Sequence, residues 1–232
     1  RDLYVVRARR ELQLVKQAGA PSPSYVDALL LRYADKPDLD AALRMIRKAE
    51  EESPWTLEPL DQEFGIIGEL THAAVRAGQS SDEAQFVAHR EAVEQAISMA
   101  RSYPPFYRYH TELLTTQFRE GITKSTPLSV FTALYDSGMK YAATLKQLLP
   151  QDPQAIDEMI GLPAALAFVQ GWRGVDPSET VKQGLDLLAE ARKMPPERAR
   201  PYQLEVALHQ AAAHYKSHLD QDPTDAYEAA YA

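Results

Sequence analysis

The stretch that decides the fold class is residues 38–54, DLDAALRMIRKAEEESP. It reads as one amphipathic helix. Asp38 can cap its start, because a short carboxylate accepts a hydrogen bond from a free backbone N–H of the first turn. Pro54 ends it, since proline has no backbone N–H and restricts the residue before it. Apolar residues recur at helical spacing between these two signals and predict one buried stripe. The stripe consists of Leu39, Ala42, Leu43, Ile46 and Ala49.

A second helix is expected directly before this one, over residues 24–34. The run Gly19-Ala20-Pro21-Ser22-Pro23 breaks the chain ahead of it, and Lys36-Pro37 ends it. Two helices that are joined by so short a turn lie antiparallel and pack as a hairpin.

This hairpin, residues 21–54, resembles one unit of the tetratricopeptide (TPR) repeat family, in which a unit is about 34 residues long. Tyr33 stands where the first helix of such a unit carries an aromatic residue. Ala42 and Ala49 stand at the two small positions of the second helix, and Pro54 is the closing proline. The sequence departs from the family pattern where a leucine replaces the small residue of the first helix, at position 30.

The resemblance implies a fold and a mode of binding. TPR-like chains form a right-handed α-solenoid in which stacked hairpins leave a curved groove for a peptide or helix of another protein. In such a repeat the first helix lines the groove. The resemblance therefore places Asp27, Leu31 and Asp35 at groove-facing positions.

Beyond residue 54 the helical pattern continues with drifting lengths. We expect about ten antiparallel helices in a single all-helical TPR-like domain over residues 1–232, with a compact irregular helical bundle as the alternative. Weaker echoes of the repeat lie at residues 165–196 and 211–223. The other expected helices cover residues 3–17, 60–76, 82–101, 106–120, 127–149, 153–170 with an interruption near 161–163, 176–194 and a last long helix to about 219, followed by a short terminal turn at 225–231.

Composition supports a folded helical protein and excludes several classes of chemistry. Hydrophobic residues make up 45% of the 232 residues, and glycine is scarce, with 10. The net charge of −8 argues against a general nucleic-acid binder, which needs cations to displace phosphate counterions. The absence of cysteine excludes disulfides, thiolate catalysis and cysteine-based zinc sites. No apolar run reaches membrane-spanning length.

The compartment does not follow from these totals. A chain without cysteine suits the cytosol and an extracytoplasmic space equally. The chain begins at Arg1 and not at methionine, which is compatible with a fragment of a longer protein.

An aromatic-rich helix is expected at residues 106–120. Phe106, Tyr109 and Leu113 share a stripe, with Phe118 further along, and we expect this stripe to be core. Tyr107 and Arg108 then face elsewhere. On a concave wall these two would be good anchors for a bound peptide, because tyrosine and arginine are enriched at binding hot spots. The alternative is an ordinary exposed helix face.

Three histidines share the last long helix. His214 and His218 are four residues apart and lie on one helical face, where they can hold a metal ion together. His209 is five residues before His214 and rotates off that face. We therefore expect surface or half-buried histidines and no metal site. The two tryptophans, Trp55 and Trp172, are expected to pack between helices.

The function expected from the sequence is a non-enzymatic interaction module or scaffold that binds a peptide or helix of another protein. No phosphate-binding glycine loop, nucleophile elbow or carboxylate dyad is present, and no cofactor is expected. Two alternatives stay open. One is a helical small-molecule-binding or metal-binding protein with a pocket near Tyr107, His110 and His214. The other is a structural subunit that forms homo-oligomers.

Overall fold

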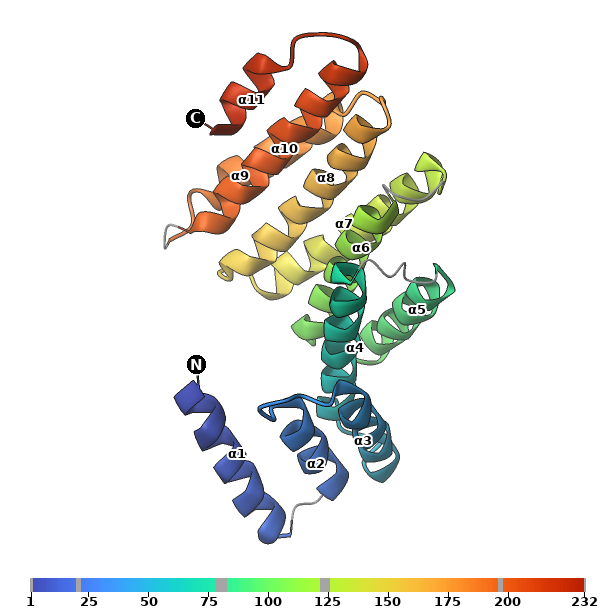
Figure 1. The fold of residues 1–232 in the computed structure, drawn as a ribbon, viewed down its shortest axis with the longest axis vertical. Helices are drawn as coiled ribbons and strands as arrows, with labels where there is room; N and C mark the ends of the chain where they lie inside the picture. The colour runs from blue at the N-terminus through green and yellow to red at the C-terminus, as the bar shows by residue number, and fades with distance from the viewer. Residues whose placement is uncertain (1, 20–21, 78–82, 122–125, 196–197, 232) are drawn as a thin grey trace. The chain divides into compact units, whose positions relative to one another are not determined.

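The computed structural model describes residues 2–19, 22–77, 83–121, 126–195 and 198–231. Over these residues the chain forms eleven helices and no strand, which confirms the all-α class (Figure 1). The helices are α1 (Asp2–Gln17), α2 (Pro23–Arg32), α3 (Leu39–Glu52), α4 (Glu58–Arg76), α5 (Glu83–Met99), α6 (Pro104–Gly121), α7 (Leu128–Leu148), α8 (Pro153–Trp172), α9 (Ser178–Ala191), α10 (Ala199–His218) and α11 (Thr224–Tyr231).

The helices divide between two compact units. The N-terminal unit, Arg1–Gln79, holds α1 to α4, and the C-terminal unit, Ser80–Ala232, holds α5 to α11. Within each unit, consecutive helices pack against one another. The expectation of one domain over residues 1–232 stays a prediction.

The stretch at residues 38–54 folds as expected. Asp38 caps α3, because its Oδ1 accepts a hydrogen bond from the Ala41 backbone N–H at 2.9 Å. The helix ends at Glu52, two residues before Pro54. Its stripe packs into the core of the N-terminal unit between α2 and α4, with Ala42, Ile46 and Ala49 fully buried.

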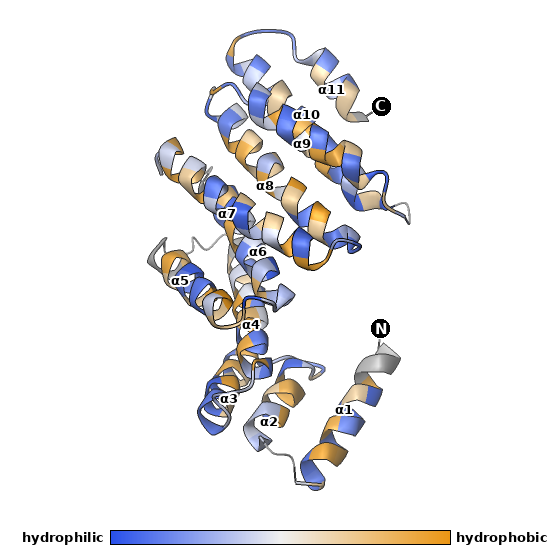
Figure 2. Ribbon diagram, turned by 180° about the vertical axis from the view of Figure 1, so that it is seen from behind, coloured by the Kyte–Doolittle hydropathy of each residue, from blue (hydrophilic) through white to orange (hydrophobic). Residues whose placement is uncertain are grey.

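Helix α8 is the centre of the C-terminal unit. It packs against α6, α7, α9 and α10, and a helix that has neighbours on several sides must be apolar over most of its surface. Figure 2 shows hydrophobic positions along most of its length. Two core clusters share α8. One joins it to α6 and α7 around Phe118, Phe131 and Leu162, and the other joins it to α9 and α10 around Ile160 and Leu208.

The expected interruption near Pro163 is wrong, because α8 runs unbroken from Pro153 to Trp172. A proline inside a helix removes one backbone hydrogen bond and costs about 3 kcal/mol. Pro163 is itself buried, as are Leu162 and Ala164 beside it. Burial of these side chains against the neighbouring helices offsets the lost bond and keeps the helix continuous.

The buried face of α6 is rotated relative to the expected stripe. Phe106 and Phe118 are fully buried, but the stripe continues through Tyr107, His110 and Leu114. Tyr109 and Leu113, which were expected in the core, are only partly buried. The expectation that Tyr107 faces away from the core is therefore wrong.

The tryptophans and the chain end also differ from expectation. Trp55 is 79% exposed and Trp172 is 47% exposed, so neither is enclosed between helices. Residues 224–231 form a full two-turn helix, α11, which packs against α10 and brings the number of described helices to eleven.

Candidate functional site

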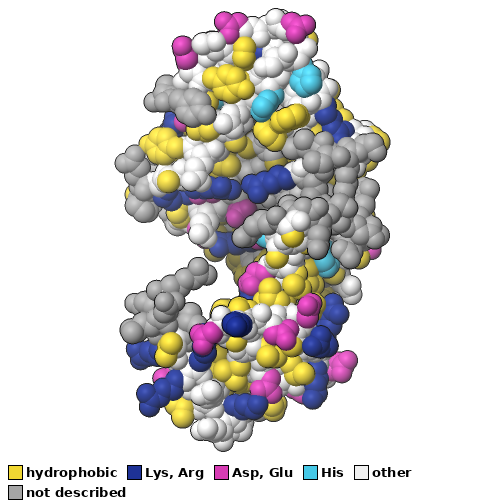
Figure 3. Space-filling model, viewed as in Figure 1, with side chains coloured by type: hydrophobic (Ala, Val, Ile, Leu, Met, Phe, Trp, Pro, Cys, Tyr) yellow, Lys and Arg dark blue, Asp and Glu magenta, His cyan; other side chains and the backbone are white. Residues whose placement is uncertain are grey.

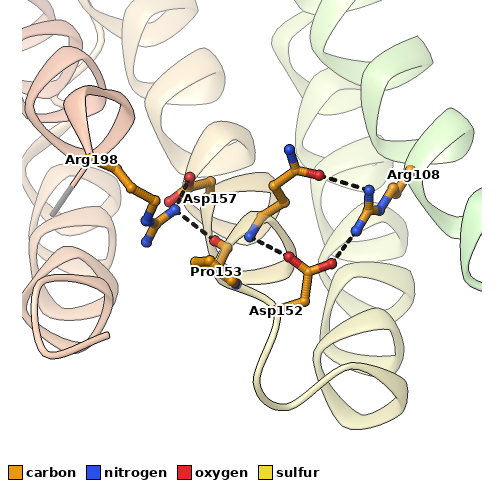
Figure 4. Close-up of polar contacts among 6 residues, drawn as sticks. Arg108, Asp152, Pro153, Asp157 and Arg198 are labelled. Atoms are coloured by element: carbon orange, nitrogen blue, oxygen red, sulfur yellow. Dashed lines mark hydrogen bonds and ion pairs between the residues drawn. The ribbon is translucent and has the colours of Figure 1, made fainter. Parts of the chain in front are cut away.

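The start of α8 is held by an arginine from α6. Asp152 caps the helix, because its Oδ1 accepts a hydrogen bond from the Gln154 backbone N–H at 2.9 Å. Its other oxygen, Oδ2, accepts from Arg108 Nη2. The second terminal nitrogen of Arg108, Nη1, donates to Gln154 Oε1 at 2.8 Å (Figure 4). Arg108, which the sequence predicted as a partner-binding residue, thus lies half-buried and fastens α6 to α8.

A second arginine reaches the same turn of α8 from the other side. Arg198 directly precedes α10, and its Nη1 donates to the Pro153 carbonyl oxygen at 2.9 Å and to Asp157 Oδ2 (Figure 4). Asp157 is 8% exposed. Loss of hydration raises the pKa of its carboxyl, and the charge of Arg198 opposes that rise. The first turn of α8 therefore lies between two guanidinium groups.

Glu158 follows Asp157 on α8 but lacks such a partner. Among the residues that the structure describes, no hydrogen bond or ion pair involves its partly buried side chain. Loss of hydration raises the pKa of Glu158 to about 7, and the negative charge of Glu112 on α6 raises it further. Arg108 and Arg200 lower it. Glu158 thus changes its charge near neutral pH.

These side chains form a charged surface across three helices. We define it by Arg108 and Glu112 of α6, Asp157 and Glu158 of α8, and Arg198 and Arg200 at the start of α10. Figure 3 shows a band of Lys and Arg side chains over the N-terminal ends of α8 and α10, with acidic side chains beside the band. The surface combines guanidinium groups that hold the helices together with a carboxylate, that of Glu158, which Arg108 and Arg200 influence by their charge without forming an ion pair with it.

The sequence analysis missed Glu158 and its surroundings, although one signal was present. Asp157 and Glu158 are the only charged residues of α8, PQAIDEMIGLPAALAFVQGW. A charge inside an otherwise apolar helix requires a partner or access to solvent. The residues that supply these partners come from positions 108, 112, 198 and 200, which the sequence separates widely.

The alternative, a pocket near Tyr107, His110 and His214, stays a prediction, and the structure shows that two of these side chains are buried. His110 is fully buried, its Nε2 lies 3.1 Å from Glu94 Oε1, and its ring packs 4.2 Å from that of Tyr141. Burial lowers the pKa of His110, and the hydrogen bond to Glu94 opposes this. Tyr107 is also buried and donates its hydroxyl hydrogen to the Arg101 carbonyl oxygen at 2.7 Å.

The histidines of α10 contact the end of α8. The ring of His214 lies 4.9 Å from that of Trp172 and 5.5 Å from that of Phe168. His218 Nε2 lies 2.7 Å from the Trp172 carbonyl oxygen. In the described part of the chain, no three His, Cys, Asp or Glu side chains are grouped so that they could hold a metal ion.

A pocket of about 480 Å³ lies between the end of α9 and the start of α10. It is lined by Arg192, Lys193, Arg198 and Tyr202, among others, and by none of Tyr107, His110 and His214. Two of its cations are already paired, Arg192 with Glu205 and Arg198 with Asp157.

Two of the three predicted groove residues of the N-terminal unit, Asp27 and Asp35, contact α1. Asp27 accepts a hydrogen bond from Lys16 Nζ, and Asp35 Oδ1 accepts one from Arg9 Nη2 at 2.7 Å. Leu31 is partly buried and packs against the core of α2, α3 and α4. The acidic groups that the sequence predicted for a partner thus contact a basic helix of the same chain.

Comparison of the chain with protein-family models, with curated proteins and with solved structures found no match in any of the three. Every helix in the described ranges is too short or too polar to cross a membrane.

Proposed function

We propose that the chain is a non-enzymatic, TPR-like interaction module whose charged surface on α6, α8 and α10 binds a peptide or helix of another protein. The pattern of helix contacts supports a solenoid of stacked hairpins. In the C-terminal unit α8 contacts both α6 and α10. Helix α7 packs against α6 and α8, and α9 packs against α8 and α10. In a curved solenoid the layer whose helices contact one another is the inner one, which forms the binding surface.

The observation that carries the proposal is the Glu158 side chain, which forms no hydrogen bond or ion pair within the described part of the chain. The acidic side chains beside it are paired, Asp152 with Arg108 and Asp157 with Arg198. Glu158 is partly buried near a second carboxylate, that of Glu112, and the charges of Arg108 and Arg200 offset only part of this cost, since the pKa is still raised to about 7. A further cation would stabilise the charged form. A lysine or arginine of a bound partner would supply that cation, so we expect the partner segment to be basic at this point.

The test is a comparison of the proteins that the full chain retains from a cell extract. A variant with Glu112→Gln and Glu158→Gln keeps the size of both side chains and removes both charges. A matched variant with Glu179→Gln and Asp186→Asn removes two exposed acids from α9. We expect a partner that the wild type and the α9 variant retain and that the Glu112/Glu158 variant loses by about tenfold.

Two results would contradict this function. One is that no protein is enriched above background by the wild type, and the other is that both variants retain the same proteins equally. Light scattering on the purified chain distinguishes a monomeric adaptor from the homo-oligomeric subunit, in which the partner is a second copy.

A further inference from the structure

Helix α1 is only loosely attached to the N-terminal unit. Among its residues from 6 onward none is buried, and Val6, Leu14 and Val15 lie on the surface, with Val6 61% exposed. Among the described helices, α1 packs mainly against α2. The core cluster of this unit, around Ala28, Ala42, Ile46 and Ile66, contains no α1 residue. Figure 2 shows that hydrophilic and hydrophobic positions alternate along α1.

The attachment depends on basic groups of α1 and acceptors of α2 and its end. Arg9 Nε donates to the Tyr33 carbonyl oxygen at 2.5 Å, and Arg9 Nη2 donates to Asp35 at 2.7 Å. Lys16, almost two turns further along α1, pairs with Asp27. The Arg9 guanidinium lowers the pKa of Asp35, which is in line with this pairing. Exposed ion pairs of this kind contribute little stability and weaken with added salt.

From this geometry we infer that the surface formed by Asp27 of α2 and Asp35 in the turn after α2 is a docking surface for a basic helix of a partner protein, and that α1 is an intramolecular occupant which the partner displaces. Asp27 and Asp35 pair with Lys16 and Arg9, two cations about two turns apart on α1, so they match any helix that carries cations at this spacing and lies along α2. The inference concerns the N-terminal unit and does not depend on the charged surface of the C-terminal unit.

The probe is a fluorescently labelled peptide with the sequence of residues 2–17, and binding to the full chain is measured by fluorescence anisotropy. In the wild type, α1 competes with the peptide at an effective concentration on the order of millimolar. A release variant, Arg9→Ala with Lys16→Ala, removes the two cations that hold α1. We expect it to bind the peptide about threefold to tenfold more tightly than the wild type does. Its α1 amides should also exchange hydrogen faster, because a detached short helix frays.

Two further variants control the experiment. Arg7→Ala with Arg10→Ala removes the same charge from exposed positions of α1 and should leave peptide affinity within about twofold of the wild type. Adding Asp27→Asn and Asp35→Asn to the release variant should weaken peptide binding about threefold to tenfold. Circular dichroism checks that each variant keeps its helices.

Three results would overturn the inference. The first is equal peptide affinity of the wild type and the release variant while α1 exchanges faster in the latter. The second is unchanged protection of α1 in the release variant, which would show that these pairs do not hold it. The third is a dimeric wild type that becomes monomeric in the release variant, which would assign the face to exchange of α1 between two copies of this chain.

Discussion

Gly171 of α8 lies so close to Ala211 of α10 that a Cβ atom at Gly171 would stand 2.2 Å from the Ala211 carbonyl oxygen. Real Cβ atoms do not approach backbone oxygen to that distance. The absence of a side chain at Gly171 is therefore what allows the end of α8 to pack backbone against backbone on α10.

This contact predicts opposite effects of two glycine substitutions in one helix. Gly171→Ala forces α8 and α10 apart and should lower the free energy of unfolding by about 3 kcal/mol. At Gly161 a Cβ would meet only Thr115 Cγ2, at an ordinary 3.9 Å. Gly161→Ala should therefore stabilise the protein by about 0.5–1 kcal/mol, because alanine favours the helix more than glycine does. Urea titration followed by circular dichroism measures both, and equal effects would contradict the packing of α8 on α10.

The parts of the fold that the sequence predicted correctly are those that depend on neighbouring residues. The cap at Asp38 and the end of α3 before Pro54 are set within one or two turns. The errors arose where tertiary packing overrides a local rule. Pro163 does not interrupt α8, because that segment is buried. Aromatic residues occur on more than one side of α6, so their spacing did not show which side is the core.

The candidate site was the least predictable part, for a similar reason. Only Arg108 was singled out in advance. Its contact with Asp152 and that of Arg198 with Asp157 join residues 44 and 41 positions apart in the sequence. A single sequence gives no measure of such distant contacts. What it offers is a weaker clue, the presence of Asp157 and Glu158 in an otherwise apolar helix.

The carboxyls of Glu50 on α3 and Glu63 on α4 predict a stability that depends on pH near neutrality. Burial, the charge of Glu63 and a hydrogen bond to Glu63 raise the pKa of Glu50 from 4.5 to about 7. The folded state thus binds this proton more tightly than the unfolded state. The contribution is fully present below about pH 4.5 and is lost as the pH rises through about 7.

Glu50→Gln should remove this dependence. Glutamine donates a hydrogen bond to Glu63 at every pH, so the variant should be about 1 kcal/mol more stable than the wild type at pH 8 and nearly equal to it at pH 4.5. Urea titrations across this pH range test it. Glu51→Gln, at an exposed position of the same helix, is the control, and a change of the same size in both variants would show that the Glu50–Glu63 contact is not the cause.

His110 predicts a dependence of the opposite sign. Burial lowers its pKa below 6.5 in the folded state, so the unfolded state binds the proton more tightly. The contribution of neutral His110 is present above pH 6.5 and is lost as the pH falls below that value. His110→Gln, which cannot be protonated in this range, should flatten the decline in thermal stability on the acidic side. If the wild type and the variant lose stability in parallel below pH 6.5, His110 is not the group that titrates.

The pair of Asp157 and Arg198 should be important for stability because little of either side chain is exposed, 10% and 16%. Asp157→Leu leaves the Arg198 charge uncompensated and should lower the free energy of unfolding by about 3 kcal/mol. Arg198→Met leaves the Asp157 charge uncompensated and should lower the free energy of unfolding by a similar amount. The double variant replaces both charges by apolar groups and should be less destabilised than either single variant.

The exposed pair of Lys146 and Glu190 provides the comparison, with a loss of less than about 1 kcal/mol for Lys146→Met. Thermal and urea unfolding of these variants measure the coupling. Additive losses at Asp157 and Arg198 would show that their contact does not hold the start of α8 to α10.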